Sequence, residues 1–310
     1  MASEPERYAQ SAEQRAAASR GVAATVAAFV IWGLFPLYLK PITDVPATEV
    51  LGHRIGWCLL FVFAWLAWKG RIGEVRAALS ERPVFLRLVG SSALISVNWG
   101  FYVWAVSNER VLEASLGYFI GPLVNVMLGV VMLGERLSPR QWISIGFAAA
   151  GVAWMTVAAG GLPWVSLLLA VSFAVYGMMR KTVAVGAVPG LAVETMLLAP
   201  FAVAWLLWLE RQGVGAFGHD LPQVNALLVG TGLITALPLA LFSTGARLIP
   251  YSMVGIIQYI GPTLQLLLGV FLYHEPFAGP RAIGFVLIWC GIAIFVGDNL
   301  RASRSGPPPP

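Results

Sequence analysis

Residues 112–135 read LEASLGYFIGPLVNVMLGVVMLGE, a run that is apolar except for a few polar side chains. The pattern returns 140 residues later, at 252–275, as SMVGIIQYIGPTLQLLLGVFLYHE. In one ungapped register, Gly121-Pro122 matches Gly261-Pro262 and Glu135 matches Glu275. Two unrelated membrane helices of biased composition would share apolar residues, but not the paired Gly-Pro and the paired terminal Glu. The sequence therefore indicates an internal duplication of a half-protein.

The composition identifies lipid as the solvent of this chain. Of its 310 residues, 58% are hydrophobic and only 11% are charged, with a mean hydropathy of +0.77, whereas ordinary soluble domains carry about 25% charged residues. The net charge of +5 comes mainly from loops between apolar segments, so we expect no nucleic-acid partner. Cys58 and Cys290 both lie inside apolar runs, which predicts neither a disulfide nor a metal site, and we expect no cofactor.

Apolar segments of about 20 residues cross the hydrocarbon layer, and the chain contains ten of them. We predict helices at about 21–40, 47–68, 86–107, 111–134, 139–158, 162–180, 190–209, 223–246, 250–273 and 279–297. The predicted divisions are a polar tail at 1–20, a first five-helix repeat at 21–158, a second at 162–298 and a disordered Pro-rich tail at 299–310. The first tail is predicted to be frayed or a short surface helix, followed by an uncleaved membrane anchor.

The basic residues predict the orientation in the membrane. With the amino terminus placed in the cytoplasm, fifteen of the twenty Lys and Arg residues fall on the inside and four on the outside. We therefore expect both termini in the cytoplasm of a cell whose plasma or inner membrane holds the protein. Because each repeat crosses the membrane five times, the second copy must enter upside down, which predicts inverted repeats. The predicted fold class is an all-α integral membrane protein of ten transmembrane helices in two inverted five-helix repeats.

Polar side chains inside the apolar segments are candidates for a central cavity. Such groups are costly in hydrocarbon and usually face a cavity or another helix. Tyr118 and Asn125 are seven residues apart on one helix face, and their repeat mates are Gln258 and Gln265. We expect these four to line a substrate cavity; the other candidates for its lining are Trp32, Asn98, Trp99, Tyr102 and Tyr259. The alternative for each residue is a hydrogen bond between helices without substrate contact.

Gly121, Pro122, Gly261 and Pro262 are candidate hinges. Glycine permits close approach of the backbone and proline removes one helical hydrogen bond, so each pair predicts a bend or an exposed carbonyl, with a static kink as the alternative. A further set of glycines suits close packing in the helices at 139–158 and 279–297, within the scaffold or across a homodimer. They are Gly146, Gly151, Gly284 and Gly291.

An ionisable cluster of Glu49, His53, Arg54 and Glu113 is predicted near the outer face. We expect Arg54 to pair with Glu113 or Glu49 as a structural tie; a role toward substrate or in proton coupling is the alternative. Glu194 occupies the repeat position of Arg54, but inversion places it near the cytoplasmic side, where a helix N-terminus would stabilise its carboxylate.

Four other charged residues have predicted structural roles. Glu135 and Glu275 are expected to hydrogen-bond the start of the helix that follows each of them. Arg180-Lys181 is expected to anchor the cytoplasmic side.

Several stretches resemble a known family. They include HRIGW at 53–57, NWGFYVWAV at 98–106, EASLGYFIGPLVN at 113–125, LGERL at 133–137, SFAVYGMMRK at 172–181, VETMLLAP at 193–200 and QYIGPT at 258–263. The chain resembles the drug/metabolite transporter superfamily, EamA type, and within it the RarD group. The resemblance implies ten helices, two EamA repeats, cytoplasmic termini and alternating-access transport of a small metabolite or drug. HEPF at 274–277 departs from the usual turn, which affects the expected shape of that loop alone.

The leading functional prediction is a secondary transporter, with a channel or a membrane-embedded enzyme as alternatives. The chain has no GxxxxGK[ST] phosphate-binding motif, so a gradient of the substrate or of a coupling ion would supply the energy. Its three histidines form no HExxH motif that would suggest a metalloenzyme. Substrate identity, direction and coupling ion do not follow from the sequence.

Overall fold

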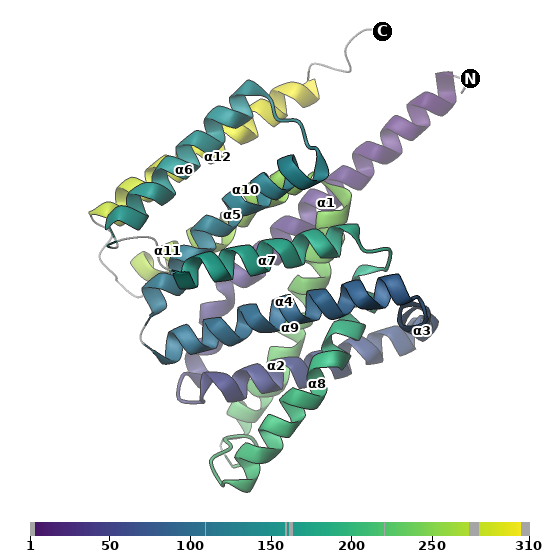
Figure 1. Ribbon diagram of the computed structural model, residues 1–310, viewed down its shortest axis with the longest axis vertical. Coiled ribbons are helices and arrows are strands. Elements are labelled where there is room, and N and C mark those ends of the chain that lie inside the picture. The colour runs from purple at the N-terminus through teal and green to yellow at the C-terminus, as the bar shows by residue number, and fades with distance from the viewer. Residues whose placement is uncertain are drawn as a thin grey trace.

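A computed structural model describes residues 4–108, 110–158, 160, 164–219, 221–272 and 279–304, and every regular element in these ranges is a helix (Figure 1). The helices are α1 Glu4–Leu39, η1 Lys40–Ile42, α2 Ala47–Trp68, α3 Ile72–Ser80, α4 Arg82–Ser107, α5 Val111–Leu133, α6 Pro139–Ala158, α7 Trp164–Thr182, α8 Ala187–Arg211, α9 Pro222–Leu248, α10 Tyr251–Gln258, α11 Ile260–Phe271 and α12 Pro280–Arg304. In this described part, nine spans are long and apolar enough to cross a membrane, α10 and α11 counting together, and α12 carries a shorter apolar stretch, Ala282–Asp298. The predicted fold class is confirmed.

The two halves pack mainly against each other. Helices α6 and α12, α5 and α10, and α2 and α8 are repeat mates in direct contact. The first helix of each half packs on the third and fourth of the other: α1 contacts α9 and α11, and α7 contacts α4 and α5. This reciprocity is what a pseudo-twofold axis between the halves requires.

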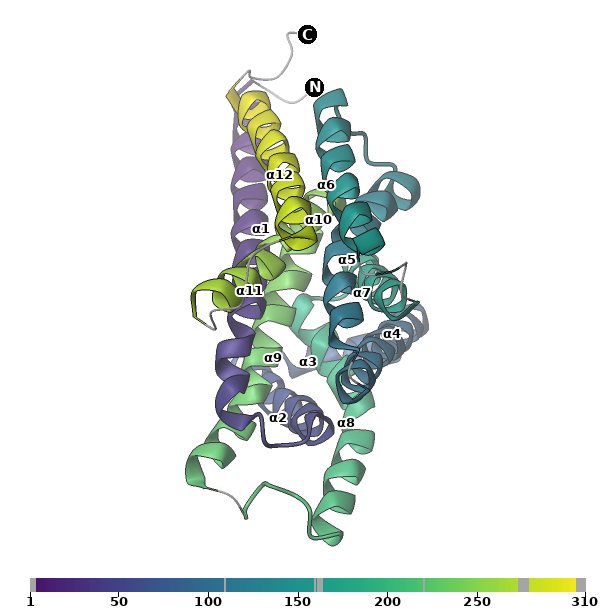
Figure 2. The ribbon, with the colours of Figure 1, turned by 90° about the vertical axis from the view of Figure 1, so that its left-hand side faces the viewer.

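Successive spanning helices run back and forth between the left and right sides of Figure 1. The start of α1 and the end of α12 therefore both lie toward the upper right of Figure 1, on the side that we call the terminal end, and both are at the top of Figure 2. An odd number of crossings in each half gives the second half the opposite direction in the membrane.

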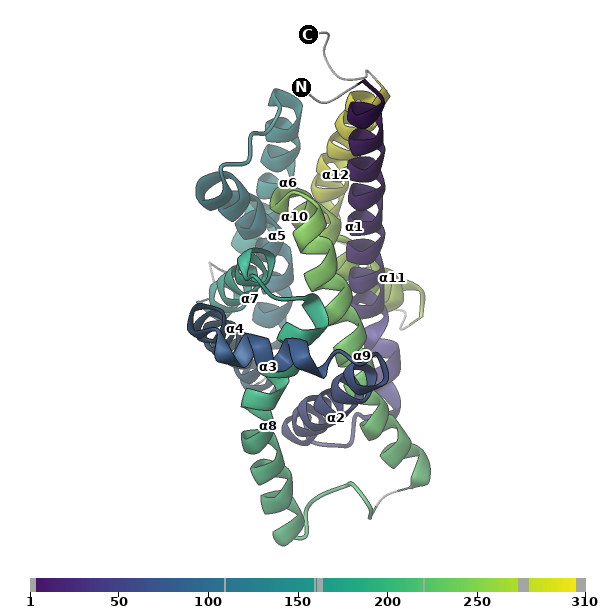
Figure 3. The same ribbon diagram turned by 90° about the vertical axis from the view of Figure 1, so that its right-hand side faces the viewer.

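Three segments are more helical than the sequence predicts. The tail predicted to be disordered at 299–310 begins inside a helix, because α12 continues to Arg304. The polar tail is part of α1 from Glu4 onward, so the first membrane helix extends through it without a break. The basic connection after α2 contains α3, a nine-residue helix that lies between the ends of α2 and α4 (Figure 3). Arg71 donates a 2.9 Å hydrogen bond to Glu74 in its first turn, and this bond lowers the pKa of the Glu74 carboxyl.

The helix predicted at 250–273 is broken at Tyr259, between α10 and α11. Proline has no backbone N–H, so Pro262 cannot donate to the carbonyl of Gln258, where α10 ends. Its repeat mate Pro122 lies within α5, which continues unbroken from Val111 to Leu133. The duplicated Gly-Pro therefore interrupts only one of the two helices.

Three of the four packing glycines join α6 to α12 of the same chain. A Cβ at Gly151 would lie 2.6 Å from the carbonyl oxygen of Gly284, and one at Gly291 would lie 2.6 Å from that of Ser144. Gly284 faces the side chain of Met155, whereas a Cβ at Gly146 would meet nothing within 4 Å. The small residues thus allow the two backbones to approach closely within one molecule.

Glu135 caps a helix of the opposite half. Its carboxylate accepts hydrogen bonds from the backbone N–H groups of Tyr251 and, at 2.8 Å, Ser252, at the start of α10. The prediction that Glu135 binds the next helix along the chain was wrong, because the packing of α5 on α10 brings the carboxylate to that N-terminus instead. The expected mate, Glu275, lies outside the described residues.

Candidate substrate cavity

A cavity of about 510 Å³ lies between the two halves. Its walls come from α1, α2, α4 and α5 of the first half and from α7, α9, α10 and α11 of the second. The exposed residues Lys40 and Thr43 line it where α1 ends, so the cavity reaches the end of the molecule opposite the terminal end. This volume is typical of a small-molecule site, for which about 300–1,000 Å³ is usual.

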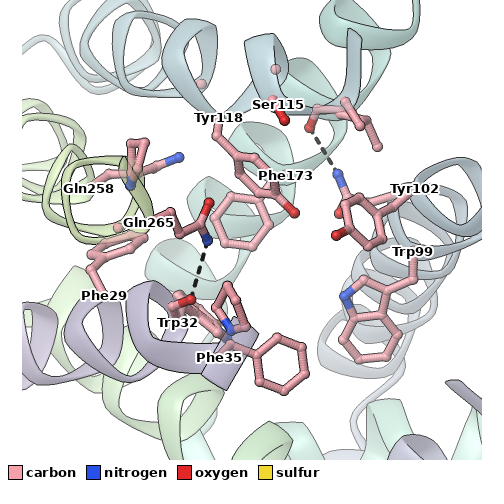
Figure 4. A pocket seen from close by; sticks show the side chains of 18 of the residues that line it. Phe29, Trp32, Phe35, Trp99, Tyr102, Ser115, Tyr118, Phe173, Gln258 and Gln265 are labelled. Carbon is pink, nitrogen blue, oxygen red and sulfur yellow. Dashed lines mark hydrogen bonds between the residues drawn. The ribbon is translucent and has the colours of Figure 1, made fainter. Parts of the chain in front are cut away.

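Most of the predicted cavity residues line this space. They are Trp32, Asn98, Trp99, Tyr102, Tyr118, Gln258 and Gln265. Figure 4 shows Tyr118, Phe173 and Gln265 extending toward one another from α5, α7 and α11. Their role toward a substrate stays a prediction.

Asn125 and Tyr259 are fully buried outside the cavity lining. Asn125 donates a 2.6 Å hydrogen bond from Nδ2 to the Oε1 of Gln258, and the Tyr259 hydroxyl donates to the carbonyl of Phe119 at 3.2 Å. Both bonds join α5 to the α10–α11 region. These two residues follow the alternative of bonding between helices, and Asn125 holds Gln258 in position.

Two of the lining amides also bind neighbouring helices. Asn98 donates from Nδ2 to the carbonyl of Leu169 at 2.9 Å and to the Ser172 hydroxyl at 3.0 Å. Gln265 donates from Nε2 to the carbonyl of Trp32 at 3.4 Å, across the contact between α11 and α1 (Figure 4). These bonds fix the amides, and the cavity wall with them, in a defined geometry.

Sequence reasoning missed several lining residues, notably Phe29, Phe35, Phe173 and Ser115. A phenylalanine in an apolar helix looks the same in the sequence whether it faces lipid or a cavity. Only the packing of α1 and α7 around the space reveals these rings. The sequence offered no signal for the three phenylalanines, whereas Ser115 is polar and lies about one turn before Tyr118.

The cavity is closed toward the terminal end by an aromatic floor, which we define as Phe29, Trp32, Phe173, Tyr176 and Phe242. Ring centroids lie 5.8 Å apart for Trp32 and Phe173, 5.4 Å for Phe173 and Phe242, and 5.9 Å for Phe29 and Phe242. Tyr176, one turn after Phe173 on α7, stacks on Phe242. Large rings in mutual contact fill the space between the cavity and the terminal end.

A buried ion pair lies beyond this floor. Arg180 is fully buried, and its Nη1 lies 3.6 Å from Oε1 of Glu194, which is 2% exposed. Ser91 and Tyr176 also donate hydrogen bonds to the Glu194 carboxylate, at 2.5 and 3.3 Å. Arg180 donates from Nε to the Ser243 hydroxyl at 3.2 Å. The pair therefore joins α7, α8, α4 and α9 on the closed side of the cavity.

This pair corrects two predictions. Arg180 is not an interfacial anchor, because its guanidinium is buried between α7 and α8. Glu194 does not sit at a helix N-terminus, because α8 begins at Ala187 and places it about two turns inside. Lys181 alone faces a helix end: its Nζ donates to the carbonyls of Ala246 and Ile249 at the end of α9.

Arg54 does not pair with Glu49. The Glu49 carboxylate accepts from the backbone N–H groups of Ala216 and Phe217, at 2.8 and 3.2 Å, and so holds the loop after α8. His53 lies 3.8 Å from Glu49 in the same group. Arg54 instead lines the cavity, one turn along α2. The side chain of Glu113 lies outside the described residues, so the other predicted partner stays a prediction.

The candidate hinge residues differ in their surroundings. Gly121, Gly261 and Pro262 line the cavity. A Cβ on Gly121 would lie 2.9 Å from Nε2 of Gln258, so a larger residue there would displace that amide. Pro122 lies outside the lining, with its carbonyl close to Gly255 of α10. Whether any of them moves during function stays a prediction.

Fold and site together define a multi-pass membrane protein in which two inverted five-helix halves enclose one central cavity. The described residues contain no group of three or more His, Cys, Asp or Glu side chains placed to hold a metal ion. The polar, aromatic and cationic lining suits binding of a small molecule.

Comparison with known proteins gives the family. The model of the EamA-like transporter family matches residues 19–157 and 161–297, one match for each half. The chain belongs to this family, and within it to the RarD group of the drug/metabolite transporter superfamily.

Three similar proteins illustrate the relationship. The chain is 41% identical to "Uncharacterized transporter YojE" of Bacillus subtilis (strain 168), over 94% of this chain and 98% of that protein. It is 41% identical to "Protein RarD" of Streptomyces exfoliatus, over 89% of this chain and 88% of that protein. One chain of known crystal structure superposes with a TM-score of 0.70 over 89% of this chain and 96% of its own length, at 20% identity, a likeness of fold alone.

Proposed function

We propose that the protein is a secondary-active transporter that moves a small metabolite or drug by alternating access. The observation that carries the proposal is the cavity between inverted halves, which reaches one end of the molecule and is closed toward the other. A pseudo-twofold arrangement supplies a second, equivalent way to pack the halves, in which the closed side would open. Relatives named as transporters support the same class of function.

The proposed orientation places both termini in the cytoplasm of the cell membrane. Fifteen of the twenty Lys and Arg residues then lie on the inside, as the distribution of basic residues in membrane proteins favours. In this orientation the cavity is open to the outside of the cell. The aromatic floor and the Arg180–Glu194 pair then form the closed cytoplasmic side.

The energy for transport would come from a gradient of the substrate itself or of a coupling ion. The sequence has no phosphate-binding GxxxxGK[ST] motif that would suggest ATP hydrolysis. A channel would need a path open at both ends, which the aromatic floor argues against. An enzyme would need a nucleophile with a base or a metal ion, and the residues that line the cavity include no cysteine, histidine or carboxylate among those described.

Counterflow in proteoliposomes tests this proposal. The purified protein is reconstituted, the vesicles are loaded with an unlabelled compound, and uptake of the same labelled compound is measured over a panel of metabolites and drugs. A carrier gives saturable uptake of the labelled compound, and the unlabelled compound inside the vesicles accelerates that uptake. Unsaturable flux with electrical conductance would identify a channel instead. Vesicles containing the Tyr118→Ala variant, inserted at the same density, are expected to show reduced counterflow.

A further inference from the structure

Arg54 presents a positive charge to the cavity. It lies on α2, and its side chain is part of the cavity lining. Its Nε donates a 3.0 Å hydrogen bond to the hydroxyl of Thr235 on α9. The guanidinium carbon lies 5.0 Å from the ring centroid of Phe35 and 5.2 Å from that of Trp99. These three contacts hold the plane of the guanidinium and leave its two terminal nitrogens without a hydrogen bond to any residue whose side chain is described.

The charged side chains that line the described part of the cavity are of one sign; the side chain of Glu113 lies outside the described residues. Among the lining residues that the structure describes, Lys40 and Arg54 are cationic and none is a carboxylate. Two buried acids related to Arg54 have other partners. Glu49, on the same helix, accepts hydrogen bonds from backbone N–H groups, and Glu194, the repeat mate of Arg54, pairs with Arg180. An arginine within a membrane-spanning segment is costly unless an opposite charge accompanies it. The cavity therefore favours an anion over a cation or a neutral molecule.

The remaining lining fits an apolar body attached to that anion. Aromatic rings surround the space next to Arg54, and the cavity of about 510 Å³ accommodates a small organic molecule. The rings are Trp32, Phe35, Trp99, Tyr102, Tyr118 and Phe173. Tyr102 and Tyr118 form an edge-to-face pair with centroids 6.2 Å apart. A flat apolar group would stack on such rings.

We propose that the substrate is a small organic anion, a carboxylate with an aromatic or apolar body, whose carboxylate binds the terminal nitrogens of Arg54. The inference rests on the proposed transport function and names the substrate class of the same cavity. Arginine suits this role because its planar fork forms two parallel hydrogen bonds with a carboxylate, which the ammonium group of lysine cannot reproduce. Lys40 also lines the cavity, at its mouth.

Ligand binding and counterflow together test the assignment. Benzoate, phenylacetate, cinnamate and hexanoate are each compared with the corresponding primary amide and amine, by thermal shift and by counterflow. The variants are Arg54→Gln, which removes the charge, and Arg54→Lys, which keeps the charge but not the fork. Arg76→Gln is the matched control, because Arg76 is exposed on α3 and lies outside the cavity lining.

The acids are expected to stabilise the wild-type protein and the Arg76→Gln variant, whereas their amides and amines do so weakly or not at all. Arg54→Gln is expected to raise the Kd for the acids at least about tenfold, equivalent to about 1.4 kcal/mol, and to remove the preference for acid over amide. The Kd of Arg54→Lys for the acids should lie between those of the wild-type protein and Arg54→Gln. A purely structural role for Arg54 would lower the melting temperature of the unliganded variants but leave the preference for acids unchanged.

Two results would overturn the anion assignment. One is equal binding of amides and acids by the wild-type protein, and the other is an unchanged preference for acids in Arg54→Gln. In either case, counterflow of the neutral compounds would leave the transport function standing. Absence of counterflow and binding for every compound would count against the transport function and this inference together.

Discussion

The buried pair of Arg180 and Glu194 supports a quantitative prediction about stability. Glu194→Gln removes one charge but keeps one oxygen, which can accept the hydrogen bond from Ser91. Arg180→Met removes the other charge and fills much of the same space with an apolar chain. Each single variant leaves a charged group buried without its partner, whereas the double variant leaves none.

The geometry sets the size of the effect. At the observed 3.6 Å separation, with an effective dielectric constant of about 20, the Coulomb attraction is about 5 kcal/mol. Removing one member of a buried pair typically costs about 3–5 kcal/mol, while replacing both by uncharged groups is often close to neutral. We therefore expect each single variant to lower the unfolding free energy by about 3–5 kcal/mol, and the double variant to be more stable than either.

A double-mutant cycle measures this coupling. Wild-type protein, Glu194→Gln, Arg180→Met and the double variant are unfolded under the same detergent conditions, and their unfolding free energies are compared. The expected interaction energy is several kcal/mol, in the direction that makes the double variant more stable than the sum of the single changes. Strictly additive changes would mean that the two charges do not stabilise each other, and would refute the reasoning from burial and distance.

Three further outcomes follow from the packing. Gly284→Ala should lower the unfolding free energy by about 1–3 kcal/mol, because its Cβ would press on Met155. Its control, Gly146→Ala, has open space around the new Cβ and should leave the melting temperature unchanged or slightly raised. Equal effects of the two variants would contradict the close contact of α6 and α12. Glu135→Ala should cost about 2 kcal/mol by leaving the first N–H groups of α10 without their acceptor, and an unchanged melting temperature would contradict that capping role. Pro262→Ala supplies the missing N–H across the break between α10 and α11. Counterflow should therefore fall, while thermal stability should be kept or raised. Normal counterflow kinetics would show that transport does not depend on the break.

The duplication and the hydrophobic run lengths were sufficient to predict the architecture. The matched Gly-Pro and the 140-residue offset indicated two halves, and run length then located the spanning helices. The break at Tyr259 could not be located this way, because the same Gly-Pro pair is accommodated inside α5 without interruption. A proline removes one hydrogen bond in both helices, and the surrounding packing decides whether the helix breaks.

The cavity was predictable where polarity marks a residue and obscure where it does not. Tyr118, Gln258 and Gln265 could be chosen because a polar group in hydrocarbon needs a partner or a cavity. Polarity could not separate Asn125, which bonds to Gln258, from the residues that face the cavity. Polarity also could not show that Arg54 faces the cavity. Glu49 binds backbone N–H groups of the loop after α8 and so does not pair with Arg54, and this contact depends on the tertiary structure.

The central claim is that one cavity is reached in turn from the two sides of the membrane, and side-specific cysteine labelling tests it most directly. In a protein with Cys58 and Cys290 replaced by Ala, Tyr118→Cys marks the cavity wall and Lys40→Cys marks its mouth. A membrane-impermeant maleimide is added to either face of oriented proteoliposomes. We predict that Lys40→Cys reacts from one face only and Tyr118→Cys from both. Reaction of Tyr118→Cys from the Lys40 face alone, with and without transported compounds, would contradict alternating access.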